Sequence, residues 1–553
     1  MTEPFVPNGK AQRQVVETRA DLTVVLGGAG TGKTVCALAA ARNHLENPGT
    51  APHDRVLFLS FSRAAVGRLL DRCAGILGAY SDRVDFMTFH ALSYSVVHRF
   101  SSLLDRPHVQ LVNKHCREIR PLEAYEIEYD DLHPLACRIL NSCPAAADLI
   151  QKRWGLVIVD EFQDTDNEEE ALLDIVTRSA RRILLGDQQQ CIYADFRGAD
   201  GVRLDRITDA CKLAGPDNVV TLPDLSHRDP TGVIPAVARA VMERRFTCPA
   251  LLDAINDERL QIWRGIDYAD EVATIEESIR RLRADDLEVA VFTHHVDVLA
   301  KLADGLEDVG VQLEIAGLGD ALACAIDSQV AMLKYAVADT DWAEITDTLA
   351  IFVISAQRGK KVPQLAWDIV HRTGSSKLQS NLDELRAQLT DSASATQLLA
   401  VAAQAHQFLG LPGKLSAWER AGSLLKPLRA RAVRQLGSGA STRLVVRNIT
   451  AAAREASTIE LTNSRADHEP HVVQLMNLYQ TKGREADATI IVLRGNDFMG
   501  KESSPFPHTS RLLYVVFSRA RKRIVVLLVG DTFPDPVAPL QRLAHPIPRG
   551  FLS

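Results

Sequence analysis

Short apolar runs recur along the chain and alternate with stretches in which apolar residues repeat at helical spacing. A short continuous apolar run bounded by polar residues is typical of a strand that is buried on both faces. Strands that alternate with helices form parallel sheets covered on both sides, so the pattern predicts an α/β fold. The expected strands are Leu22–Leu26, Val56–Leu59, Leu156–Val159, Ile183–Leu185, Val289–Phe292, Thr489–Leu493 and Ile524–Val529.

These strands fall into two groups, which predicts two α/β cores, each interrupted by a mainly helical insertion. The first core is expected at residues 1–93 and 132–215, with a short insertion at 94–131. The second core is expected at residues 216–349 and 466–553. Its larger insertion, residues 350–465, is rich in helical pattern and is punctuated by Pro363, Pro412, Pro427 and a Gly437-Ser438-Gly439 loop.

Composition is that of a globular protein, with 46% apolar and 24% charged residues among 553. No apolar run reaches the roughly eighteen residues of a spanning helix, and residues 1–10 lack the pattern of a signal peptide, so no membrane association is expected. The nine cysteines form no CxxC pair, which argues against a zinc or iron–sulfur site and fits a cytoplasmic location. The net charge of −7 weighs weakly against nucleic-acid binding, although a groove needs only local positive charge.

A glycine-rich loop follows the first expected strand and opens a helix. Loops of this kind direct backbone N–H groups at phosphate oxygens, and the helix N-terminus adds a favourable field. Lys33 is expected to reach the β and γ phosphates, and Thr34 to hold Mg²⁺. The loop therefore predicts a nucleotide site made of Gly27, Gly28, Ala29, Gly30, Thr31, Gly32, Lys33 and Thr34.

A second signal is the pair of carboxylates that ends the strand Leu156–Val159. In parallel α/β folds the carboxyl ends of neighbouring strands meet at one edge, beside the phosphate loop. Asp160 is expected to bind Mg²⁺, and Glu161 to orient or deprotonate the attacking water.

The segment Asp160-Glu161-Phe162-Gln163-Asp164 resembles the magnesium motif of UvrD/Rep/PcrA-type helicases of superfamily 1A. Further segments resemble other motifs of this family in the family's order. The resemblance implies two RecA-like parallel-sheet domains with ATP between them. The matching segments are Ser60-Phe61-Ser62, Thr88-Phe89-His90, Gly186–Tyr193 with Phe196–Ala199, His227-Arg228, Gln480–Glu485 and Leu513–Ala520.

The resemblance also implies roles at the nucleotide. Gln12 lies where the family reads adenine, His227 stands where the family has a stacking tyrosine, and Glu485 is similar to the residue that contacts the ribose. Gln190 is similar to the residue that senses the γ-phosphate. Arg228 and Arg519 resemble the two arginines that reach the γ-phosphate from the second core, a role that suits a planar, permanently charged guanidinium.

For nucleic acid, the resemblance implies 3′ to 5′ movement on single-stranded DNA. Phe61, Tyr193 and Phe196 match the family's base-stacking aromatics, and Thr88 and His90 match its early DNA-contact motif. Stacking a base on an aromatic ring is tolerant of sequence, as a motor requires. Single aromatics are also common in cores, and for Tyr193 both interpretations stay open.

Positive charge collects in the larger insertion. Between Lys414 and Arg454 there are nine basic residues and one acidic residue, Glu419. The stretch is either a surface for the backbone of duplex or single-stranded DNA, or a solvated or partner-docking helical face. Two further functions stay open beside a helicase. One is a translocase that does not unwind, and the other is a nucleotide-binding subunit that serves a nuclease partner.

Overall fold

The apolar runs of the N-terminal half form one parallel sheet. A computed structural model describes residues 7, 9–61, 75–106, 108–112, 116–194, 201–294, 296–315, 318–357, 362–413, 415–437, 439–462, 472–497, 508–548 and 551. The sheet has the order β3-β2-β6-β7-β1-β8, and every neighbouring pair is parallel. Its strands are β1 (Leu22–Leu26), β2 (Val56–Ser60), β3 (Val84–Thr88), β6 (Leu156–Val159), β7 (Arg181–Gly186) and β8 (Val219–Thr221).

This strand order decides which loops meet. Strand β7 lies between β1, which leads into the glycine-rich loop, and β6, which leads into the two carboxylates. The segment after β7 therefore lies between them at the same sheet edge. Helix α2 (Lys33–Glu46) packs on β6 and β7, and α9 (Arg206–Ala214) packs on β1. The remaining helices here are α1 (Lys10–Glu17), α4 (Phe89–Arg99), α6 (Leu132–Ser142), α7 (Pro144–Gln151) and α8 (Asn167–Val176).

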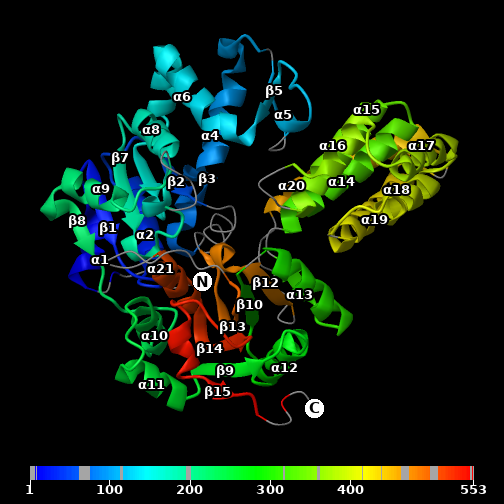
Figure 1. Ribbon diagram of the computed structural model, residues 1–553. Coiled ribbons are helices and arrows are strands. Elements are labelled where there is room, and N and C mark those ends of the chain that lie inside the picture. Colours follow the sequence, from blue (N-terminus) through cyan, green and yellow to red (C-terminus); the bar gives the residue numbers. More distant parts are fainter. Residues whose placement is uncertain are drawn as a thin grey trace. The chain divides into compact units, whose positions relative to one another are not determined.

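A second sheet has the order β11-β12-β10-β13-β14-β9-β15, and its pairs from β12 to β15 are parallel. The central strands are almost completely buried, because helices cover them (Figure 1). The strands are β9 (Leu260–Ile266), β10 (Val289–Thr293), β11 (Leu313–Ile315), β12 (Val473–Asn477), β13 (Ala486–Arg494), β14 (Ala520–Val529) and β15 (His545–Pro546). The helices are α10 (Val233–Met242), α11 (Pro249–Asn256), α12 (Glu271–Ala284), α13 (Val296–Asp308), α21 (His508–Phe517) and α22 (Ala538–Gln541).

The two sheets confirm the predicted fold class, and all seven predicted strands are present. Both sheets belong to one compact unit, Met1–Asp105, Leu132–Glu314 and Arg465–Ser553. The first sheet also includes β8, which lies beyond residue 215, where the sequence placed the end of the first core. In the described residues, no helix is both long enough and apolar enough to cross a membrane.

A second compact unit consists of Arg106–Asp131 and Ile315–Ser464. It begins before residue 350, because buried apolar residues of α14 (Leu318–Ala336) join the apolar core of the helices that follow. Its short segment begins after α4, which packs on β3 and α6 of the larger unit. The other helices are α5 (Cys116–Ile119), α15 (Trp342–Gln357), α16 (Gln364–His371), α17 (Ser376–Asp391), α18 (Ala395–Leu409), α19 (Leu415–Leu436) and α20 (Thr442–Thr462), beside the strands β4 (Gln110–Val112) and β5 (Glu126–Glu128).

The two expected insertions thus form one helical unit. Arg120 donates to both carboxylate oxygens of Glu126 at 2.7 and 2.8 Å, and it also pairs with Asp347 of α15. Ile119 is buried in the helical core, and its carbonyl oxygen lies 2.9 Å from His371 Nε2. A bidentate guanidinium–carboxylate pair fixes direction as well as distance, so the short segment is docked specifically.

Candidate nucleotide and nucleic-acid sites

The glycine-rich loop connects β1 to α2, and residues that precede α10 pack against it. Gly30 and Gly32 have φ of 79° and 87°, a region that favours glycine. A Cβ at Gly30 would collide with the side chain of Ser226, and one at Gly32 would lie 3.3 Å from the His227 ring. The His227 N–H donates to the Gly30 carbonyl oxygen at 2.8 Å. The cradle thus needs its glycines both for backbone shape and for close packing.

Lys33 and Thr34 begin α2 and face the loop and the carboxylates. Lys33 Nζ is largely buried and donates to the carbonyl oxygens of Gly27 and Gly28, at 2.5 and 3.1 Å. Thr34 Oγ1 donates to Asp160 Oδ2 at 3.3 Å. A hydroxyl and a carboxylate side by side, next to an ammonium group, suit Mg²⁺ bound to a nucleotide phosphate.

The two carboxylates after β6 have opposite electrostatic environments. Burial and the charge of Glu161 raise the pKa of Asp160 to about 6. Burial would also raise the pKa of Glu161, but Lys482 and Lys33, together with a hydrogen bond from Gln163, outweigh burial and hold this pKa at about 2. Gln163 Nε2 donates to Glu161 Oε2 at 2.7 Å. Such a carboxylate is charged at neutral pH, as either role expected for Glu161 requires.

Glu161 also carries backbone strain. Its φ is 55°, in the left-handed region that non-glycine residues rarely adopt. Such a position costs on the order of 1–3 kcal/mol and persists where the surroundings over-determine it. The Glu161 side chain is held at the strand end by the hydrogen bond from Gln163.

Gln190 links two charged groups that belong to different sheets. Its Nε2 donates to Asp187 Oδ2 at 2.9 Å, and its Oε1 accepts from Arg519 Nη2 at 3.3 Å. Burial raises the pKa of Asp187. Burial and the nearby Arg228 lower the pKa of Arg519, and a bound phosphate would relieve this effect. Gln190 therefore connects Asp187, which follows β7, with Arg519, which precedes β14.

Arg228 offers a test of whether the site fits a phosphate. Its Nε pairs with Glu485 Oε2 at 2.7 Å. Its Nη1 is buried, and among the described residues it has no hydrogen-bond partner. A buried guanidinium N–H is costly unless it is paired, and a nucleotide phosphate oxygen would pair it. Glu485 thus orients the Arg228 side chain and leaves Nη1 for a phosphate. Gln12, the expected adenine-reading residue, is buried in α1.

Two residues that sequence reasoning missed complete this site. Lys482 Nζ pairs with Asp164, lies 3.6 Å from Glu161 Oε2 and donates to the Gln190 carbonyl oxygen at 2.8 Å. The Asp164 side chain is completely buried, and the Lys482 side chain is 5% exposed. Tyr514 Oη accepts from the Ala29 N–H at 3.5 Å. Both residues lie inside recognised segments, but their contacts join positions hundreds of residues apart.

The expected base-stacking residues are partly brought together. The rings of Phe61 and Tyr193 are stacked, with centroids 5.2 Å apart and planes 22° apart. Both are half-buried, and Tyr193 Oη donates to the Tyr479 carbonyl oxygen at 2.9 Å. Thr88 caps α4 by accepting from the Ala91 N–H at 3.1 Å, and His90 lies in the first turn of that helix. Phe196 lies outside the described residues.

The fold and this site define a P-loop ATPase core with two RecA-like sheets. A family profile described as "AAA domain" matches residues 12–195. Two similar proteins are each named as a subunit of an ATP-dependent helicase/nuclease. The protein from Streptococcus sanguinis is 40% identical over 73 residues, 13% of this chain and 6% of that protein. The protein from Lactococcus lactis is 30% identical over 96 residues, 17% of this chain and 8% of that protein.

A third relative, the exonuclease/helicase subunit RexA of Streptococcus pneumoniae, is 28% identical over 128 residues, which is 22% of this chain and 10% of the relative. The matched stretches therefore span a tenth or less of these relatives' own lengths. The residues matched by the family profile, 12–195, include the glycine-rich loop and the two carboxylates of this site.

Proposed function

We propose that this protein hydrolyses ATP with Mg²⁺ to move 3′ to 5′ along single-stranded DNA and to unwind duplex ahead of it. Thr34 and Asp160 would hold Mg²⁺, and Lys33, Arg228 and Arg519 would stabilise charge on the γ-phosphate. When bound, Mg²⁺ would neutralise part of the negative charge on the phosphate oxygens. Closure and opening of the two cores with each ATP would shift the protein along the strand.

The observation that carries the proposal is the contact of Arg519 with Gln190, at 3.3 Å, directly beside the Lys482–Asp164 pair. Groups of the second sheet thereby reach the phosphate end of the first, as a nucleotide-driven closure requires. The test is the steady-state ATPase rate with and without single-stranded DNA. We expect strong stimulation, and a rate that is indifferent to DNA would contradict the motor function.

We expect Phe61→Ala to uncouple DNA binding from hydrolysis. Loss of a stacking surface costs about 1–3 kcal/mol per base, which is roughly 5- to 150-fold in affinity. Single-strand binding, measured by fluorescence anisotropy, should weaken, while ATP turnover without DNA stays close to wild type. Phe100→Ala at the end of α4 is the control. Equal DNA affinity in both variants would make Phe61 a packing residue.

The basic stretch of the helical unit separates into paired and unpaired side chains. Arg443 and Arg447 both pair with Asp339, at 2.7 Å each. Lys426, Arg431 and Arg434 of α19 are exposed. Among the described residues they form no ion pair, so their positive charge is available to an external anion such as a DNA phosphate.

Changing Lys426, Arg431 and Arg434 together to glutamine should weaken duplex binding for all sequences. Each phosphate contact adds about 0.9 to the slope of log affinity against log salt, so the slope should become shallower. The double change Arg443→Gln and Arg447→Gln is the matched control, because those guanidinium groups already serve Asp339. Equal slopes in both variants would leave α19 as a solvated or protein-docking face.

A second candidate function is that of a motor subunit in a complex with a nuclease. It is favoured by the names of the relatives, which describe helicase/nuclease subunits, although they are matched over a small part of their length. Affinity purification of the chain from its native cell, followed by nuclease assays, tests this function. Strand displacement by the isolated chain would favour the first proposal.

A further inference from the structure

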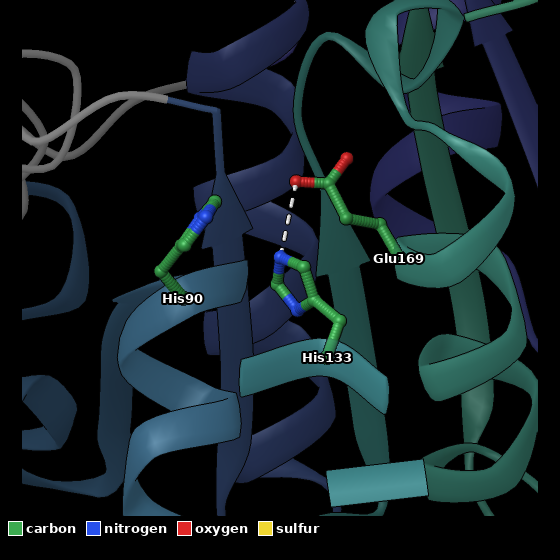
Figure 2. A group of neighbouring side chains, drawn as sticks. All are labelled: His90, His133 and Glu169. Carbon is green, nitrogen blue, oxygen red and sulfur yellow. Dashed lines mark ion pairs between the residues drawn. The ribbon is translucent and has the colours of Figure 1, made fainter. Parts of the chain in front are cut away.

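Two imidazole rings and one carboxylate meet beside the first sheet (Figure 2). His90 comes from the first turn of α4, His133 from the first turn of α6 and Glu169 from the first turn of α8 (Figure 2). One potential ligand atom from each residue lies within 4.8 Å of the others. His133 and Glu169 are buried, and His90 is half-buried. Three helices therefore direct metal-binding atoms at one point.

The two buried side chains, His133 and Glu169, are each held in place by a neighbouring group. In both, the held atom is the one that faces away from the other two ligands. His133 Nδ1 lies 2.7 Å from Ser93 Oγ, so its Nε2 is the atom that faces Glu169. Glu169 Oε2 accepts from the Asp166 N–H at 3.0 Å as part of a capping box, and its Oε1 lies 3.9 Å from His133 Nε2. Histidine ligands in metal sites are oriented in this way, by a hydrogen bond to the second ring nitrogen.

The spacing between the facing atoms suits an ion better than a direct hydrogen bond. A separation of 3.9 Å between Nε2 and Oε1 is too long for a hydrogen bond. Two ligands of one tetrahedral zinc ion, each bonded at about 2.0–2.1 Å, lie roughly 3.3–3.4 Å apart. Small side-chain rotations would bring the three atoms to that spacing. The His90 and His133 rings are already adjacent, with centroids 4.4 Å apart.

We propose that His90, His133 and Glu169 bind one divalent transition-metal ion of the zinc type. Two imidazole nitrogens and one carboxylate oxygen are a donor set that selects such an ion over Mg²⁺, which prefers oxygen. The site is separate from the one formed by Thr34 and Asp160. A fourth position stays open to water or another small ligand. The lack of a CxxC pair in the sequence bears only on cysteine-ligated metals.

The position of the ligands along the chain gives the ion a structural role. His90 precedes and His133 follows the segment Arg106–Asp131, which leaves the larger unit and returns to it. Glu169 follows the Asp160–Asp164 segment on the next helix. An ion at this point would tie α4, α6 and α8 together. It would also fix the helix that begins with the expected DNA-contact residues Thr88 and His90.

The test uses the full-length chain without an affinity tag, stripped with a chelator and titrated with Zn²⁺ or Co²⁺. We expect one equivalent of tightly bound metal that millimolar Mg²⁺ does not displace, visible d–d absorption bands with Co²⁺, and a higher thermal midpoint with Zn²⁺. Glu169→Gln keeps the acceptor of the capping box and removes the charged ligand, and His90→Asn removes one imidazole. Each should weaken Zn²⁺ binding at least about tenfold.

Two variants serve as controls that should bind metal normally. His98→Asn alters an exposed histidine of the same helix, and Asp160→Asn alters the expected Mg²⁺ ligand. Absence of saturable binding by the wild-type chain would leave His133 and Glu169 as a buried ion pair and overturn the proposal. Undiminished binding by both ligand variants would place the ion elsewhere and overturn it equally. If Asp160→Asn loses ATPase activity but still binds the metal, the zinc-type site and the proposed motor function are separate properties.

Discussion

Glu161→Gln should lower DNA-stimulated ATP turnover by at least about tenfold, with nucleotide binding retained. The carboxylate is ionised at neutral pH, because nearby positive charge holds its pKa at about 2, and Gln163 fixes its direction. Glutamine keeps the shape of the side chain and removes the charge that, in the proposed function, orients the attacking water. Lys33→Ala should lower turnover similarly and also weaken ATP binding, because the proposed contact of Lys33 with phosphate would form in the ground state as well.

Steady-state phosphate release and binding of a fluorescent ATP analogue separate these two effects. Glu168→Gln, at an exposed carboxylate on α8, is the matched control and should behave as wild type. Turnover close to wild type in Glu161→Gln would remove Glu161 from the hydrolytic step. Wild-type turnover in Lys33→Ala would refute the phosphate role of the glycine-rich loop.

Lys482→Met should both destabilise the protein and reduce its turnover. Removing one partner of a buried ion pair leaves an uncompensated charge, here Asp164, at a cost of about 3–5 kcal/mol. The change also removes the main positive charge that lowers the pKa of Glu161. That pKa should rise, so turnover in the variant should fall as the pH is lowered through the weakly acidic range, where wild-type Glu161 is still ionised.

The double variant Lys482→Met with Asp164→Asn separates the two effects. It removes both buried charges, so much of the lost thermal stability should return, while turnover and its stimulation by DNA stay low. Thermal unfolding and ATPase assays across pH measure both properties. Lys522→Met, at an exposed lysine of β14 paired with Asp487, is the control. Full recovery of turnover in the double variant would assign Lys482 a role in stability alone.

The local sequence pattern predicted many of the strands and helices, whereas the tertiary contacts depend on residues far apart in the chain. The seven predicted strands were readable because each is a short apolar run, and the glycine loop because its spacing is local. The buried strand β12 was missed, because Gln474 and Asn477 interrupt its apolar residues. Strand β3 was missed since its burial is partial, with Asp85 and Thr88 interrupting the apolar residues. Helix α14, which the sequence placed in the second core, packs with the helices that follow it, and an apolar helix does not reveal from its sequence which core it joins.

The candidate site shows the same division. The positions of Lys33, Asp160 and Glu161 at one sheet edge follow from strand order, which parallel topology makes predictable. The Lys482–Asp164 pair and the His90–His133–Glu169 cluster depend on side chains from separate elements, and no spacing along the chain encodes them. Asp164 in particular reads as part of an acidic loop, although the fold buries it completely.

The chain passes between the two compact units four times, after Asp105, before Leu132, after Glu314 and before Arg465. The first two crossings belong to the sheet that carries the glycine loop, and the last two to the sheet that carries Arg519. The helical unit is therefore tethered to both arms of the proposed motor, and Arg120 fastens the two tethers to each other. A change in the distance between the two sheets would therefore act on the helical unit through both of its connections, which Arg120 joins.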